Sequence, residues 1–101
     1  MIIYQGEEFN MAKFSENAIT VYEYVKEHEA EDLTAQDIAD GTGLNVKTVN
    51  GIVTSAFQLR KEIMERIPAE IELEDGTHKP VKIIKLTAKG KGISNIRTYE
   101  E

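Results

Sequence analysis

The segment from residue 45 to residue 61 has polar side chains that can recognise nucleic-acid groups, and it contains no acid. The Asn50 amide can pair with an adenine edge, Lys47 can reach guanine or a phosphate, and Val46 can contact a thymine methyl group. If the segment is a helix, its outward face carries Val46, Lys47, Asn50, Gly51 and Thr54. Because a solvated helix surface would carry the same residue types, this face is a candidate interface only.

Gly51 lies in the middle of this segment. A glycine inside a helix costs about 1 kcal/mol relative to alanine, so some contact should offset that cost. Close approach to a DNA backbone is one such contact, and close packing within the protein is the other. The sequence leaves both interpretations open.

A first helix is predicted from Glu16 to His28, where Ser15 is a suitable N-cap because its hydroxyl can accept from a first-turn amide. Four apolar residues recur at helical spacing and should form its buried face: Ala18, Ile19, Tyr22 and Val25. This helix is expected to support the fold rather than to carry a site.

Two further helices are predicted after the first, and the second of these two carries the candidate interface. Thr34 starts the second, and Asp37 stands at the position of a capping-box partner. Gly43 ends that helix, because glycine enters the left-handed region at little cost. Asn45 caps the third helix, which should continue to about Arg60 or Ile63. Its buried side should consist of Val49, Ile52, Val53, Ala56 and Leu59.

The spacing around the turn predicts a helix-turn-helix. Such a motif needs a small residue where the helices cross, a turn residue that tolerates positive φ, and an apolar residue one turn into the second helix. Ala39, Gly43 and Val49 meet these needs in order.

A β-hairpin is predicted after Pro68, where apolar residues begin to alternate with acids. Asp75-Gly76 is a turn signal, and Val81, Ile83, Ile84 and Leu86 define the second strand. A two-residue turn would place Pro80 opposite Ile71 and turn Val81 to the acidic face, so a longer loop through His78 or a bulge is expected.

Two stretches are similar to a known family. Thr34 to Leu59, TAQDIADGTGLNVKTVNGIVTSAFQL, resembles the helix-turn-helix of bacterial and phage winged-helix regulators. Ile83 to Gly90, IIKLTAKG, is similar to the strand and LTxxG ending of the wing in MarR-type regulators. The resemblance covers roughly residues 15–92. It implies an α+β winged helix-turn-helix fold, with a three-helix core followed by a two-stranded hairpin wing.

The resemblance also implies double-stranded DNA as a partner and a role in transcription regulation or as a phage accessory factor. The recognition helix would be 46–60, lying in the major groove. Thr34 and the Asn45 amide would touch phosphate, and Lys79 and Lys82 of the wing would flank the minor groove or the backbone. The two lysines fit equally well as cross-strand partners of Glu70, Glu72 and Glu74.

The charge distribution leaves a second function open. The net charge is −6 overall; residues 1–40 carry two lysines and ten acids (−8), and residues 41–101 carry ten basic residues and eight acids (+2). The stretch 76–97 holds six basic residues and no acid. Acids in the first helix and the first wing strand are instead typical of a protein-interaction module that does not bind DNA.

Other classes are not expected. The chain has no cysteine, no long apolar run and no basic start of the kind a signal peptide has, which fits a cytoplasmic protein without membrane contact. Because His28 and His78 are the only histidines and no phosphate loop is present, no enzyme, metal or cofactor is expected.

The domain is expected over residues 14–92, between an N-terminal arm (1–13) and a C-terminal tail (93–101). A homodimer through the arm or the first helix is a further hypothesis. The apolar residues of the arm that would serve it are Ile2, Ile3, Tyr4 and Phe9.

Overall fold

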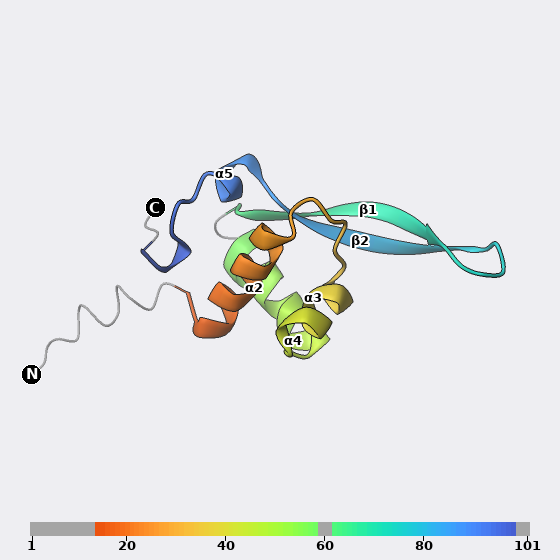
Figure 1. The fold of residues 1–101 in the computed structure, drawn as a ribbon, viewed down its shortest axis with the longest axis horizontal. Coiled ribbons are helices and arrows are strands. Elements are labelled where there is room, and N and C mark those ends of the chain that lie inside the picture. The colour runs from red at the N-terminus through yellow and green to blue at the C-terminus, as the bar shows by residue number, and fades with distance from the viewer. Residues whose placement is uncertain (1–13, 59–61, 99–101) are drawn as a thin grey trace, which may run out of the picture.

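The computed structural model describes residues 14–58 and 62–98 of the chain. It has an α+β fold in which helices come first and a long antiparallel hairpin follows, projecting from the helices (Figure 1). This layout is compatible with the predicted winged arrangement. The helical segments are α2 (Glu16–Glu27), α3 (Ala35–Thr42), α4 (Val46–Ile52), the π-helix η1 (Val53–Gln58), α5 (Ala88–Lys91) and the 3-10 helix η2 (Ile96–Thr98).

The predicted helix starts are confirmed. The Ser15 hydroxyl accepts from the Ala18 N–H at 3.1 Å. Thr34 and Asp37 form a complete capping box, with bonds of 3.2 and 3.0 Å. Asn45 caps α4 with a single bond, in which its side-chain oxygen accepts from the Thr48 N–H at 2.8 Å. Each cap satisfies an amide that the helix itself leaves unpaired, so the three starts are determined locally.

The turn between α3 and α4 also agrees with the prediction. Gly43 has a φ of 80°, in the left-handed region, and its N–H donates to the Ala39 carbonyl oxygen at 2.9 Å. Ala39 and Val49 are both buried, at 3% and 0% exposure. The three residues that the helix-turn-helix spacing singled out therefore have the expected environments.

The predicted end of the third helix at Ile63 is wrong, whereas the alternative end near Arg60 lies outside the described residues. The α-helix stops at Ile52 and continues as a π-helix to Gln58, while Ile63 is buried and lies outside any helix or strand. Because a π turn closes i→i+5 bonds, it changes which side chains point inward. Phe57 is fully buried in place of Ala56, which is only partly buried. Leu59 and Arg60 lie outside the described residues.

The hairpin pairs β1 (Met64–Glu72) with β2 (His78–Leu86). Strand β1 begins four residues before Pro68, so the predicted strand start is wrong. Pro68 fits inside it because each strand of a two-stranded sheet has an open edge. The pairing is continuous and residues 73–77 connect the strands, so a loop longer than two residues is confirmed and no bulge is present. The loop does not extend through His78, which already pairs with Glu72. Glu70, not Ile71, lies opposite Pro80.

The loop at the hairpin tip is held by its own side chains. Gly76 adopts a φ of 87°, which only glycine enters easily. Asp75 accepts from the hydroxyl and the backbone N–H of Thr77, at 2.6 and 3.0 Å. These bonds lower the pKa of the Asp75 carboxyl group, so it stays ionised at neutral pH.

One hydrophobic core joins the helices to the base of the hairpin. The Ile84 N–H of β2 donates to the Leu33 carbonyl oxygen at 2.7 Å, so the connection between α2 and α3 lies against the sheet. The long strands therefore start from a fixed base. The most deeply buried large side chains are Tyr22, Ile38, Phe57, Ile63, Met64 and Ile84.

The segment LTxxG has a structural role. Thr87 caps α5 and its hydroxyl lies 2.7 Å from the Glu62 carbonyl oxygen. A Cβ on Gly90 would come within 2.2 Å of the Ile63 carbonyl oxygen, so no larger residue fits without movement. Beyond Gly92, Ile93 and Ile96 are buried in the core, so the packed domain extends past its predicted end at residue 92.

Tyr22 links α2 to this segment. Its hydroxyl donates to the Gly90 carbonyl oxygen at 2.8 Å, in the interior. Burial, with a smaller contribution from Glu29, raises the pKa of the Tyr22 hydroxyl, which therefore remains a donor.

Tyr22→Phe should lower the free energy of unfolding by about 1–3 kcal/mol, because the Gly90 carbonyl loses its buried donor. Urea denaturation followed by circular dichroism measures this change, and Tyr24→Phe, on the same helix, is the control. Equal stability of Tyr22→Phe and the wild type would show that this hydrogen bond contributes nothing.

Candidate nucleic-acid interface

The predicted outward face of the third helix is at the surface. Thr54, in the π-helical turn, is half-buried, and the opposite side of the same helix enters the core through Val49 and Val53. Four side chains or backbone positions are exposed: Val46, Lys47, Asn50 and Gly51. The orientation of the helix is therefore as predicted, and its exposed part carries no acid.

Gly51 has open space around it. A Cβ built at this position would meet no heavy atom within 4 Å. Close packing within the protein, one of the two explanations for this glycine, is therefore excluded for the described residues. No contact in the described part of the chain offsets the cost of this helical glycine.

Thr34 and Asn45, the predicted phosphate contacts at helix starts, are half-buried and exposed, respectively. The side-chain oxygen of each accepts a capping hydrogen bond. What remains to contact an anion is the hydroxyl hydrogen of Thr34 and the amide hydrogens of Asn45. Capping and phosphate contact are therefore compatible at both positions.

Arg66 is the functional candidate that the sequence did not reveal. From β1 its Nη1 donates to the Thr54 hydroxyl at 3.0 Å and to the Gln58 side-chain oxygen. Its Nη2 donates to Oδ1 and the backbone oxygen of Asn50, at 2.9 and 3.4 Å. One guanidinium thus ties the hairpin to three successive turns of the α4–η1 helix.

A signal for this contact was present. Asn50, Thr54 and Gln58 recur every four residues and form a polar ridge without a charged partner of its own. A guanidinium offers five N–H donors and no acceptor, so it suits a row of side-chain oxygens. Recognising it required knowing that β1 begins before Arg66.

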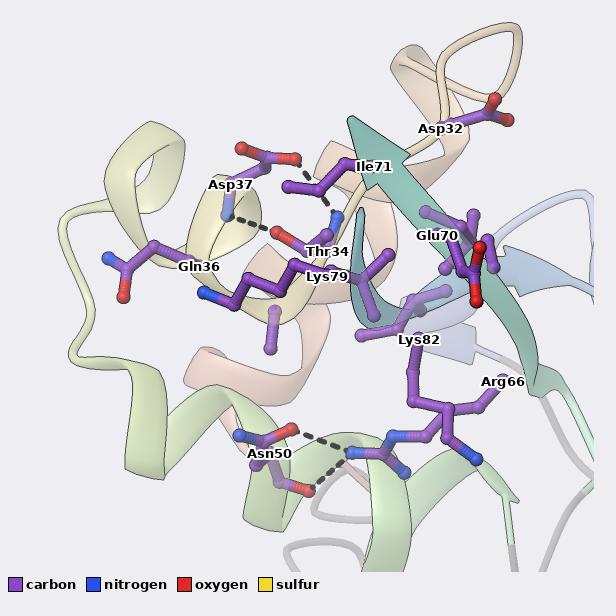
Figure 2. A pocket seen from close by; sticks show the side chains of 15 residues that line it. Asp32, Thr34, Gln36, Asp37, Asn50, Arg66, Glu70, Ile71, Lys79 and Lys82 are labelled. Atoms are coloured by element: carbon purple, nitrogen blue, oxygen red, sulfur yellow. Dashed lines mark hydrogen bonds between the residues drawn. The ribbon is translucent and has the colours of Figure 1, made fainter. Parts of the chain in front are cut away.

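A groove of about 620 Å³ lies between α3, α4 and the hairpin. Gln36 of α3 and Thr34, the N-cap of that helix, line one side, Asn50 lies at one end, and the strands form the other side (Figure 2). Lys79 extends from β2 in the direction of α3 (Figure 2). The groove therefore brings together Thr34, Asn50, Lys79 and Lys82, while Val46, Lys47 and Gly51 lie outside its lining.

The acidic and the basic side chains that line the groove differ in whether they already have partners within the fold. Its three carboxylates all have partners: Asp37 in the capping box, Glu70 with His78 at 3.2 Å, and Asp32 with Lys85 at 3.3 Å. Lys79 and Lys82 make no ion pair or hydrogen bond with the described residues. The alternative in which these lysines pair across the strands with Glu70, Glu72 or Glu74 is therefore not seen.

Other basic residues of the stretch 76–97 are used within the fold. Lys85 donates to the carbonyl oxygens of Glu29 and Glu31, at 3.0 and 2.7 Å. Lys91 pairs with Glu29 at 3.8 Å, and Arg97 with Glu16 at 2.7 Å. Part of the positive charge in the second half of the chain is therefore already bound by acids and carbonyl oxygens of the first half.

No protein-family model, curated protein or solved structure matches this chain. A function has to be inferred from its own residues. Within residues 14–58 and 62–98, no helix is long and apolar enough to cross a membrane, and no three potential ligands among His, Asp and Glu cluster as a metal site would require.

The hairpin also exposes apolar and acidic side chains, of which Glu70 and Ile71 line the groove. Ile67, Ile71 and Leu73 are 42%, 43% and 41% exposed. Acids accompany them at Glu70, Glu72, Glu74 and Asp75. This mixture of apolar and acidic groups is poorly suited to a phosphate surface.

A homodimer through α2 stays a prediction. Tyr24 is half-buried, and five apolar residues of α2 are buried within the chain: Ala18, Ile19, Val21, Tyr22 and Val25. The N-terminal arm, 1–13, lies outside the described residues, so dimerisation through it stays a prediction.

Proposed function

We propose that this chain has a winged helix-turn-helix fold and binds double-stranded DNA, with α4 in the major groove and the hairpin as the wing. The single observation that carries the proposal is the exposed, acid-free face of α4 with Gly51 open at its centre. A helix that accepts the cost of an interior glycine there, with no contact among residues 14–58 and 62–98 to offset it, is suited to a close external surface.

The free cations support the same orientation. Lys47 is on the exposed face of α4, and Lys79 and Lys82 are at the groove beside it. None of the three has an ionic or hydrogen-bonding partner among the described residues. A duplex lying over α4 would neutralise them with phosphates, and the released counterions would favour binding. A regulator of transcription or a phage accessory factor is the role this activity fits.

Titration of a fluorescent random-sequence duplex, followed by anisotropy, tests the proposal. Binding should weaken steeply between about 50 and 200 mM salt. Lys47→Ala with Asn50→Ala should weaken binding about tenfold and leave the melting temperature close to that of the wild type.

The matched control is Asn17→Ala with Lys91→Ala, which removes the same residue types from the surface of α2 and from an existing ion pair. It should bind DNA as the wild type does. If the duplex is not bound even at low salt, the DNA proposal is wrong.

Binding of a basic protein partner is the second candidate, favoured by the exposed apolar and acidic side chains of the hairpin. Purification from nuclease-treated extract would then yield a stoichiometric protein whose binding is lost on Glu72→Lys with Glu74→Lys. Recovery of nucleic acid alone would count against it.

A further inference from the structure

The hydrogen bond between Arg66 and Asn50 determines which way the Asn50 amide faces. A guanidinium can only donate, so the amide atom turned toward it must be the oxygen. Oδ1 of Asn50 accordingly lies 2.9 Å from Nη2 of Arg66. The amide nitrogen Nδ2 then lies on the opposite side, away from the hairpin (Figure 2).

Arg66 itself is not free to contact a base. Both of its terminal nitrogens already donate, to Asn50, Thr54 and Gln58. A guanidinium that recognises guanine needs two of these N–H groups for the base. Arg66 therefore acts through Asn50 and is a positioning residue.

The orientation of the amide limits what Asn50 can recognise. Pairing with adenine requires the amide to present its oxygen to N6–H and its nitrogen to N7 at the same time. Here the oxygen is turned to the hairpin, and only the N–H donors face outward. Guanine presents two acceptors, N7 and O6, on its major-groove edge and no donor there.

We propose that Arg66 fixes Asn50 as a donor and thereby gives the protein a preference for guanine over adenine at one base pair. This inference rests on the proposed DNA binding, and it replaces the adenine contact that the sequence suggested for Asn50. The charge of Arg66 contributes to affinity for any duplex, whereas its forked geometry contributes to the choice of base.

Selection of binding sites from a random duplex pool, followed by anisotropy on the selected site, tests the inference. Asn50→Asp keeps an acceptor for Arg66 but has no donor, so it identifies the position that Asn50 contacts. At that position the wild type should prefer guanine to adenine by about fivefold or more.

Arg66→Lys retains the positive charge and loses the planar guanidinium with its several fixed N–H donors. It should bind random DNA within about twofold of the wild type, because the number of phosphate contacts is unchanged. Its preference for guanine over adenine should fall to about twofold or less, because the amide of Asn50 is then free to turn.

Gln58→Met is the matched control, because it removes another acceptor of the same guanidinium and leaves Asn50 in place. It should retain the guanine preference. Thermal melting of each variant shows whether it is folded. If Arg66→Lys fails to fold, the base preference of the wild type decides the inference: a preference for adenine over guanine at the position that Asn50→Asp identifies overturns it, and a preference for guanine supports it.

The outcomes separate the two proposals. Wild-type DNA binding with an unchanged base preference in Arg66→Lys, or in Asn50→Asp, overturns the role of Arg66 and leaves DNA binding intact. Absence of wild-type binding to any duplex overturns both.

Discussion

Phe57→Ala should lower the free energy of unfolding by about 3–5 kcal/mol, the largest stability change expected from any single side chain discussed. Phe57 is fully buried, at 0% exposure. Its ring stacks on Phe14 with centroids 5.2 Å apart and is tilted against Tyr22 at 6.1 Å. Alanine would remove both ring contacts and leave a cavity at the centre of the core.

Urea denaturation monitored by circular dichroism measures this loss, and Leu73→Ala is the control. Leu73 is 41% exposed in the hairpin loop, so its truncation should change stability by about 0.5 kcal/mol or less. A loss below about 1 kcal/mol for Phe57→Ala would contradict the π-helical phase that turns this residue inward.

The helix starts were predictable because the interactions that determine them span three residues. Ser15, Thr34 and Asn45 each accept from an amide three positions on, and no distant residue is needed. Gly43 was predictable for the same reason, since positive φ is a property of one residue. For the hairpin, the sequence could only exclude one register, the one with a two-residue turn at Asp75-Gly76. That register would turn Val81 to the acidic face.

The π turn and the start of β1 could not be predicted from local patterns. Residues 53–58 continue an apolar helical periodicity, and the change to i→i+5 bonding places Phe57 rather than Ala56 against Phe14 and Tyr22. Strand β1 begins at Met64 because its side chain and Ile63 are buried in the core formed with α2. Both features follow from tertiary packing, which overrides local preference.

The sequence could predict which single residues of the candidate interface are exposed, but not which residues of other elements contact them. The exposed positions of α4 follow from helical period alone. Arg66 joins residues of β1 and α4 across the fold, and Lys85 holds the connection between α2 and α3. A count of basic residues in sequence could not distinguish Lys85, which has internal partners, from Lys79 and Lys82, which have none among the described residues.

Gly51→Ala should change stability and DNA binding in opposite directions. A Cβ at this position meets nothing within 4 Å, and the residue lies inside α4, so alanine should stabilise the helix by about 1 kcal/mol. For a domain of this size that gain raises the melting temperature by about 4–8 °C. If α4 lies against DNA, the added methyl group occupies the space needed for the duplex backbone. Affinity should then fall about fivefold or more, the size expected for overpacking a tight contact.

Thr20→Ala provides the matched control, because it places alanine at an exposed position of α2, away from α4. It should also stabilise the protein, by about 0.5 kcal/mol, and leave DNA binding unchanged. Differential scanning fluorimetry and anisotropy on the same preparations measure both quantities. A Gly51→Ala protein that is more stable and binds DNA as tightly as the wild type would show that the duplex does not approach α4 at this residue. A more stable protein that has lost binding would show that the glycine is retained for the interface, since no contact within the described structure requires it.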